Sequence, residues 1–232
     1  MSAAKPLIVA HRRNTPEALR ATDRRHGVEV DIRSKGDRLT VHHDPFVAGG
    51  DFDEWLADYD HALVILNVKE EGLEARLLGR MAGRGIEAFF FLDQSFPFLI
   101  RTLRSGERRC AVRVSEYESV ETALRLAGQA QWVWLDSFTG ALPPAAGLAR
   151  LAESGFRICA VSPELQGRRP EDRWPCNRDR RLAWPDSNNS AAKPASTNLD
   201  ATLPRRHHIP PQAAAPSSPM PEQFRGRSSR RD

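Results

Sequence analysis

Polar side chains that could act on a charged substrate recur where short apolar runs end. His11 closes the run LIVA, Glu29 and Asp31 lie in GVEVDIR, and His43 follows RLTVH. Side chains alternate across a strand, so Glu29 and Asp31 share a face and repel unless a proton or a cation lies between them. Hard divalent cations prefer such oxygen ligands, and two histidines can remove and return a proton near neutral pH. These residues predict cation-assisted acid–base chemistry.

Basic side chains accompany this group at the ends of the apolar runs. They are Arg12, Arg33, Lys69 and Arg113. Their positive charge suits an anionic ligand such as a phosphodiester, and we predict that the three arginines bind it. An alternative interpretation is that Glu29 and Asp31 only pair with Arg33 and Arg12 in a salt-bridge network.

The elements that must position these residues alternate regularly along the chain. Seven apolar runs are typical of strands, at residues 7–11, 27–33, 61–69, 87–93, 109–115, 131–136 and 156–162. Segments with helical spacing lie between them, at residues 15–25, 73–84, 96–106, 119–128 and 144–155. This alternation predicts βαβ units and a parallel sheet. A hairpin-like insertion at 38–46 and an acidic amphipathic segment at 52–60 interrupt it after the second strand.

The fold class indicated is α/β, with a parallel (β/α) barrel of the TIM type. Seven strands are recognisable, and the eighth is missing or irregular. Active sites of such barrels lie at the carboxyl ends of the strands, where the polar residues above are found. Trp132 and Trp134 share a strand face with Asp136, so they line a substrate site or fill the barrel core. His42 and His61 lack such a context, and we expect surface or packing roles for them.

The chain changes character after residue 168. We assign residues 1–168 to the barrel and residues 169–232 to a Pro-, Arg-, Ala- and Ser-rich tail that is predicted to be disordered. Ten of the 17 prolines fall between Pro170 and Pro221. Acidic and basic residues balance up to residue 169, so the net charge of +4 comes from the remainder. A truncated or frame-shifted product is an alternative explanation of such an end.

Composition excludes several classes of protein. No run approaches the roughly 18 apolar residues of a membrane span, and the first residues do not resemble a signal peptide, so we expect a cytoplasmic protein. Cys110, Cys159 and Cys176 form no CxxC pair, which argues against disulfides and zinc. The neutral barrel region shows no basic stripe with interleaved aromatics, which argues against nucleic acid as a partner. The oligomeric state stays open.

The order of the motifs resembles that of a known superfamily. His11-Arg12, the E-x-D of residues 29–31, His43-Asp44 and Lys69 are similar to the motifs of glycerophosphodiester phosphodiesterase and phosphatidylinositol phospholipase C-like barrels, over roughly residues 7–165. The resemblance implies that His11 and His43 form the acid–base pair and that Lys69 contacts the phosphate or the transition state. It also implies one Ca²⁺ or Mg²⁺ bound by Glu29 and Asp31.

Two residues depart from the family pattern. Arg13 stands where the family usually has Gly, and Asn67 stands where it has a Glu two residues before the Lys. Asn67 can still bind a metal through its carbonyl oxygen, although without charge, and Asp93 is a candidate to supply the missing carboxylate. The resemblance implies a metal-dependent phosphodiesterase acting on a small-molecule phosphodiester by His/His acid–base catalysis. The alternative is a catalytically impaired barrel that binds a phosphorylated ligand without turning it over.

Overall fold

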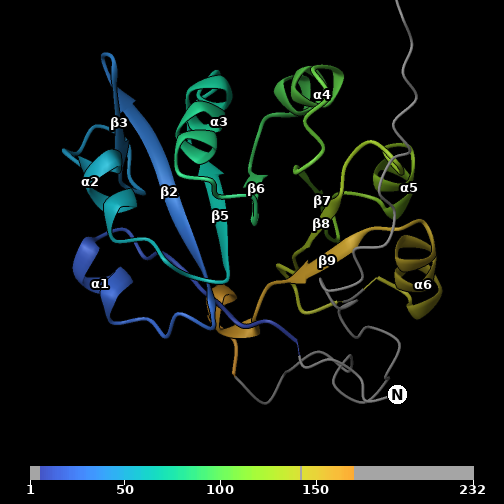
Figure 1. Cartoon of the computed structure of the whole chain (residues 1–232). Coiled ribbons are helices and arrows are strands. Elements are labelled where there is room, and N and C mark those ends of the chain that lie inside the picture. The colour runs from blue at the N-terminus through green and yellow to red at the C-terminus, as the bar shows by residue number, and fades with distance from the viewer. Residues whose placement is uncertain (1–5, 142, 170–232) are drawn as a thin grey trace, which may run out of the picture. The chain divides into compact units, whose positions relative to one another are not determined.

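A computed structural model describes residues 6–141 and 143–169 as a row of parallel strands with helices packed against them (Figure 1). The strands are β1 (Val9–Ala10), β2 (Gly27–Lys35), β3 (Arg38–Val41), β4 (Gly50–Asp51), β5 (Leu63–Val68), β6 (Phe89–Leu92), β7 (Ala111–Val114), β8 (Trp132–Leu135) and β9 (Arg157–Ala160). The helices are α1 (Pro16–Arg20), α2 (Phe52–Ala57), α3 (Glu74–Gly83), α4 (Phe96–Arg104), α5 (Val120–Leu124) and α6 (Ala145–Glu153), followed by a 3₁₀ turn at Pro163–Gln166. All seven strands predicted from apolar runs are confirmed. The predicted tail lies, apart from Arg169, outside the described residues.

Side-chain caps fix where several helices begin. Thr15 Oγ1 accepts a hydrogen bond from the Ala18 N–H (3.1 Å), and Pro16 follows as the first residue of α1. Asp51 and Ser119 cap α2 and α5 in the same way. Such oxygens satisfy N–H groups that have no partner within the helix. The sequence thereby sets the points at which the chain turns back after β1, β4 and β7.

The strands pair in chain order. β1 lies beside the start of β2, and β5 and β6 follow on the other side of β2, all parallel. β7, β8 and β9 form a second parallel set, and a parallel bridge between Phe91 and Cys110 joins it to β6. The predicted hairpin-like insertion contains β3, which is antiparallel to the end of β2. The register sets Asp31 beside Asn67 on neighbouring strands.

The two faces of the strands carry separate apolar clusters. The outer face, which bears Val28, Val30 and Ile32, packs against helix residues such as Leu77 of α3 and Leu99 of α4. The inner face bears the polar residues Glu29, Asp31 and Asn67. Its apolar cluster consists of Leu63, Ile65, Phe90, Leu92, Ala111, Trp132, Trp134 and Val161. Trp132 stacks on Phe90, with ring centroids 4.2 Å apart, so the two tryptophans fill the core.

The terminal strands of this row are its least buried members. Every residue of β5, β6 and β8 is buried, whereas β1 and β9 contain no buried residue. Ile8, directly before β1, is 62% exposed. Within residues 6–141 and 143–169, no ladder joins β1 to β9. The described part of the chain is therefore a mixed α/β fold with parallel sheet segments and no closed barrel.

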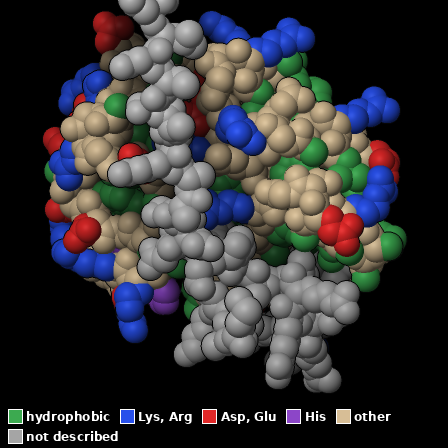
Figure 2. Space-filling view, turned by 45° about the vertical axis from the view of Figure 1, so that its right-hand side comes forward, with side chains coloured by type: hydrophobic (Ala, Val, Ile, Leu, Met, Phe, Trp, Pro, Cys, Tyr) green, Lys and Arg blue, Asp and Glu red, His purple; other side chains and the backbone are tan. Residues whose placement is uncertain are grey.

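The described helices include none that is long and apolar enough to cross a membrane. On the face drawn in Figure 2, the basic side chains of the described residues lie apart from one another, among acidic and apolar ones.

Gly27 should be essential for the close approach of three strands. A Cβ at this position would lie 3.0 Å from Val9 Cγ2 and 3.2 Å from Leu63 Cβ. Gly27→Ala should therefore lower the free energy of unfolding by about 1–3 kcal/mol, measured by urea denaturation. Gly79→Ala is the matched control, because Gly79 lies in α3 with open space around it. This substitution should raise the free energy of unfolding by about 0.5–1 kcal/mol. Equal stability of the two variants would contradict this packing.

Candidate functional site

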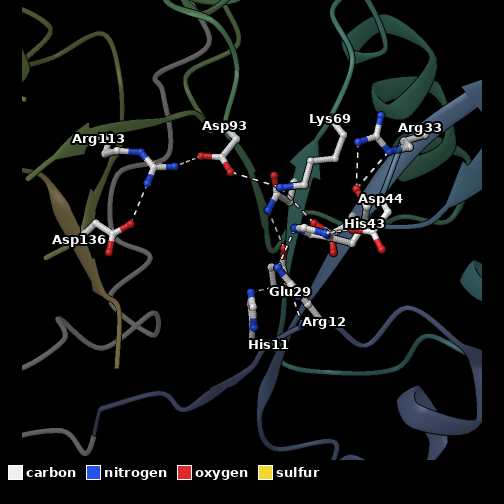
Figure 3. A network of polar contacts seen from close by, with 12 residues as sticks. His11, Arg12, Glu29, Arg33, His43, Asp44, Lys69, Asp93, Arg113 and Asp136 are labelled. Carbon is white, nitrogen blue, oxygen red and sulfur yellow. Dashed lines mark hydrogen bonds and ion pairs between the residues drawn. The ribbon is translucent and has the colours of Figure 1, made fainter. Parts of the chain in front are cut away.

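The candidate site lies where β1, β2 and β5 end, beside the loop between β3 and β4 (Figure 3). His11 and Arg12 directly follow β1, Glu29 and Asp31 lie in β2, Asn67 lies in β5, Lys69 follows it, and His43 lies in the β3–β4 loop. The structure brings these seven predicted residues together through the contacts described below.

Glu29 lies at the centre of these contacts. Its side chain is 1% exposed, and Oε1 accepts a hydrogen bond from Asn67 Nδ2 (2.7 Å) while Oε2 accepts one from the Arg12 N–H (2.7 Å). His11 Nε2 lies 3.7 Å from the same Oε2. Burial and the neighbouring charge of Asp31 raise the pKa of Glu29 to about 7. Glu29 thus holds the start of the β1–α1 loop and gains or loses a proton near neutral pH.

Asp31 is fully buried and is held by a residue that sequence reasoning missed. Asn14 Nδ2 donates to Asp31 Oδ2 (2.7 Å), and Asn14 Oδ1 accepts from the Asp31 N–H (3.0 Å). Lys69 Nζ lies 3.2 Å from the other oxygen, Oδ1, as an ion pair without a hydrogen bond. Asn14 follows His11, Arg12 and Arg13 in the β1–α1 loop. Its amide, three residues beyond His11, is the sequence feature that could have indicated this contact. It anchors this loop to β2.

Arg12 connects the two histidines of the site. Its backbone has a φ of 51°, in the left-handed region, and its guanidinium lies 2.6 Å from His43 Nε2. His43 Nδ1 lies 2.8 Å from Asp44 Oδ1. An arginine can only donate, so His43 Nε2 acts as an acceptor and Nδ1–H donates to Asp44. The imidazole is therefore held in the tautomer that presents a basic Nε2 to the site.

The side chain of His11 is slightly more buried than that of His43. Burial, followed by the positive charge of Arg12, lowers the pKa of His11. Its nearest carboxylate is that of Glu29, with Oε2 lying 3.7 Å from His11 Nε2.

A row of alternating charges continues along the strand ends. Lys69 Nζ lies 3.4 Å from Asp93 Oδ2, Asp93 Oδ1 accepts from Arg113, and Arg113 Nη1 donates to Asp136 Oδ2 (2.7 Å). Within the described residues, Asp93 and Arg113 reach the Glu29–Asp31 pair only through Lys69. The ligand role of Asp93 and the substrate role of Arg113 stay predictions. Asp136 completes the row and was not among the predicted site residues.

Arg33 anchors the loop that carries His43. Its Nε and Nη2 donate to the carbonyl oxygen of His43 (3.2 and 2.9 Å), and its Nη1 lies 3.6 Å from Glu70 Oε1. The alternative interpretation, a salt-bridge network of Arg33 and Arg12 with the β2 carboxylates, is therefore wrong, because Arg33 pairs with Glu70 and Arg12 binds Glu29 through its backbone. Binding of substrate by Arg33 stays a prediction.

The packing role expected of His61 is confirmed by its contacts. Its ring lies against Tyr59, with centroids 5.7 Å apart, and its Nε2 is 3.2 Å from the carbonyl oxygen of Thr22. His42 hydrogen-bonds through Nδ1 to the backbone of Asp44. His42 thus lies in the loop that carries His43, whereas His61 packs before the start of β5, at the end of the strands remote from the site.

The donor atoms near Glu29 can be tested against a divalent cation. In the described part of the chain, no group of three or more His, Cys, Asp or Glu side chains could hold a metal ion. The group here contains two carboxylates and an amide. Asn67 Oδ1 and Asp31 Oδ1 are buried oxygens that accept no hydrogen bond, and their residues are register partners in β2 and β5. Asp31 Oδ1 is ion-paired with Lys69 Nζ, and Asn67 Oδ1 is the buried oxygen that best fits a hard divalent cation.

Comparisons with known proteins give a likeness of fold. No protein-family model and no curated protein matches the chain. A solved protein from Agrobacterium tumefaciens named as a glycerophosphoryl diester phosphodiesterase is 16% identical with a TM-score of 0.53, over 66% of this chain and 83% of its own. A glycerophosphodiester phosphodiesterase from the same organism is 16% identical with a TM-score of 0.48, over 67% and 86%. The first of these likenesses supports the α/β fold.

The raised pKa of Glu29 predicts how stability varies with pH. A folded-state pKa of about 7 against 4.5 means that the folded chain holds this proton more tightly. Stability from Glu29 is then present below pH 4.5 and lost as the pH rises to 7. Between pH 5 and 8 the free energy of unfolding should fall by about 2–3 kcal/mol more in the wild type than in Glu29→Gln, as measured by urea denaturation at each pH. Parallel profiles would show that Glu29 titrates normally.

Proposed function

We propose that this chain is a metal-assisted phosphodiesterase of the glycerophosphodiester type, built on a TIM-type (β/α) barrel. The observation that carries the proposal is the position of two imidazoles beside the buried Glu29–Asp31 pair, with Arg12 bound to Glu29 and His43. The fold shared with a protein named as a glycerophosphoryl diester phosphodiesterase adds support. The substrate is a small phosphodiester.

The two histidines exchange the protons of the reaction. Water or a neighbouring hydroxyl of the substrate attacks phosphorus and gives its proton to one neutral imidazole. The other imidazole enters the step as the imidazolium and protonates the departing alkoxide as its P–O bond breaks. Asp44 orients His43 through Nδ1, so Nε2 is the atom that faces the reaction. Arg12 shares this Nε2 in the resting site and moves its charge to the phosphate when substrate binds.

Positive charge is needed because the substrate is an anion that approaches two buried carboxylates. Arg12 and Lys69 supply charge from the protein, and Lys69 is fixed between Asp31 and Asp93. A divalent cation, Ca²⁺ or Mg²⁺, held by Glu29, Asp31 and Asn67 would neutralise and polarise the phosphoryl oxygens. The surrounding contacts then keep the phosphate close to both imidazoles.

The second candidate is a barrel that binds a phosphorylated ligand without turnover. Asn67 favours it, because its amide donates to Glu29 where the family resemblance implies a third carboxylate. Hydrolysis of glycerophosphodiesters or bis-(p-nitrophenyl) phosphate that EDTA abolishes separates the two. Tight binding of such an ester with no turnover in Ca²⁺ or Mg²⁺ would establish the second function instead.

Removal of either imidazole should disable turnover. His11→Ala and His43→Ala should each lower kcat roughly 10²–10⁴-fold, as loss of a general acid or base does. His26→Ala is the control, because His26 directly precedes β2 at the end remote from the site, and it should keep the wild-type rate. A His43→Ala enzyme of full activity would exclude the two-histidine mechanism.

A third carboxylate should strengthen metal binding. Asn67→Glu replaces an amide that donates to Glu29 with a charge that repels it, so the metal-free variant should melt lower. Added Ca²⁺ or Mg²⁺ should restore its melting temperature and bind about tenfold more tightly than to the wild type, by calorimetry. Asn67→Gln has similar reach without charge and should show no gain. Unchanged affinity in Asn67→Glu would remove residue 67 from the ligand set.

A further inference from the structure

Exposed apolar side chains gather on the loops at the site end of the strands. In the described residues the large exposed ones are Ile8, Phe46, Val47, Phe96, Tyr117, Phe138 and Leu165. Phe96, Tyr117, Phe138 and Leu165 follow the carboxyl ends of the parallel strands β6, β7, β8 and β9, and Phe46 and Val47 lie in the β3–β4 loop that carries His43. Apolar side chains concentrated on one rim indicate a ligand surface.

Tyr117 and Phe138 are the two rim residues whose rings contact each other. Tyr117 follows β7 and is 75% exposed, and Phe138 follows β8 and is 45% exposed. Their ring centroids lie 5.9 Å apart, with the planes at 47°. The two rings come from separate loops and present apolar area to solvent side by side.

Glu116 fixes the two loops to each other. Its carboxylate accepts hydrogen bonds from the N–H groups of Phe138 (3.0 Å) and Thr139 (2.9 Å) and from the hydroxyls of Ser137 and Thr139 (2.8 Å each). Burial opposes ionisation, but these hydrogen bonds outweigh it and hold the pKa of Glu116 well below its usual range. The loop after β7 is also closed on itself, since the Tyr117 N–H donates to Ser115 Oγ (3.1 Å). The exposed rings are therefore held in place before any ligand binds.

The charge row connects this ring pair to the proposed reaction centre. It passes from Asp31 through Lys69, Asp93 and Arg113 to Asp136, which accepts a hydrogen bond from the Ser137 N–H (2.9 Å) next to Phe138. β7 and β8 lie three and four strands along the row from β2, so a group on one alcohol of the substrate meets the rings by extending along this rim.

We propose that Tyr117 and Phe138 form a subsite for an apolar group on one alcohol of the phosphodiester, and that Glu116 is the positioning residue of this subsite. The inference rests on the proposed phosphodiesterase function and specifies its substrate class. Fixed aromatic rings bind an alkyl chain or a planar ring with little loss of conformational entropy. Substrates carrying such a group are preferred to those with two small polar alcohols.

The test compares three glycerophosphodiesters whose second alcohol is methanol, octanol or benzyl alcohol. The full chain is the enzyme, and the glycerol phosphate that it releases from each ester is measured. All three leaving groups are primary alcohols, so a difference in kcat/KM reports binding of the apolar group. The kcat/KM of the octyl or of the benzyl ester should exceed that of the methyl ester about tenfold. A higher value for the octyl ester indicates a surface that binds an alkyl chain, and a higher value for the benzyl ester indicates one that binds a planar ring. Tyr117→Ala and Phe138→Ala should each remove most of this preference through KM, with kcat and the methyl ester unaffected.

Matched variants separate positioning from stability. Glu116→Ala should weaken the preference as loss of a ring does, and Glu116→Gln, which keeps one acceptor oxygen, should restore part of it. Ile8→Ala removes an equally exposed apolar side chain beyond the rim and should keep the preference. Equal kcat/KM for the three esters, or a preference that survives both ring substitutions, would overturn the subsite and leave the phosphodiesterase intact. If no ester is cleaved, the proposed function fails, and calorimetric affinities decide the subsite: tighter binding of the octyl or benzyl ester sustains it, and equal affinities overturn it.

Discussion

Two carboxylates buried two residues apart on one strand are the constraint on which the rest of the site depends. A buried charge without partners costs several kcal/mol, and a like charge beside it adds to this cost. Each oxygen of Glu29 and Asp31 has a nitrogen of Asn67, Arg12, Asn14 or Lys69 near it. The pKa of Glu29 is still raised to about 7, so these partners compensate incompletely. An anionic substrate can approach this pair only if further positive charge accompanies it.

The strand ends distribute positive charge unequally among their basic residues. Lys69 lies between two carboxylates and Arg113 among three, which fix their positions and offset their attraction for phosphate. Arg12 has an imidazole as its side-chain partner, so its charge is the most available to a ligand. Arg12 and Asp93 both have backbone in the left-handed region, with φ of 51° and 59°, at the ends of β1 and β6. Strain of this kind persists where surrounding contacts hold it, as they do around both residues.

Period-two alternation and the rule that parallel strands end at one edge were enough to predict the strands and the residues that meet there. Contacts made by loops were beyond that reasoning. Asn14 binds Asp31 because of the path of the β1–α1 loop, and Arg33 binds a carbonyl oxygen because of the path after β3. The choice between core and ligand surface for Trp132 also needed the structure, since both outcomes share one strand pattern. Sequence periodicity gives the face of a side chain, and only the packed loops give its partner.

The site and the edge of the sheet stabilise each other. β1 has two residues and, within the described part of the chain, one neighbouring strand, yet it carries His11 and Arg12 at its end. Three further contacts hold this end: the Arg12 N–H donates to Glu29 Oε2, the Arg13 N–H donates to the Glu29 carbonyl (2.8 Å), and Trp55 Nε1 donates to the Arg13 carbonyl (2.6 Å). Glu29 therefore acts twice, as a charge in the site and as the attachment of an edge strand. Because of this double role, replacement of Glu29 alters the positions of His11 and Arg12 together with the electrostatics of the site. Asn67 or Lys69, in contrast, can be replaced without releasing β1.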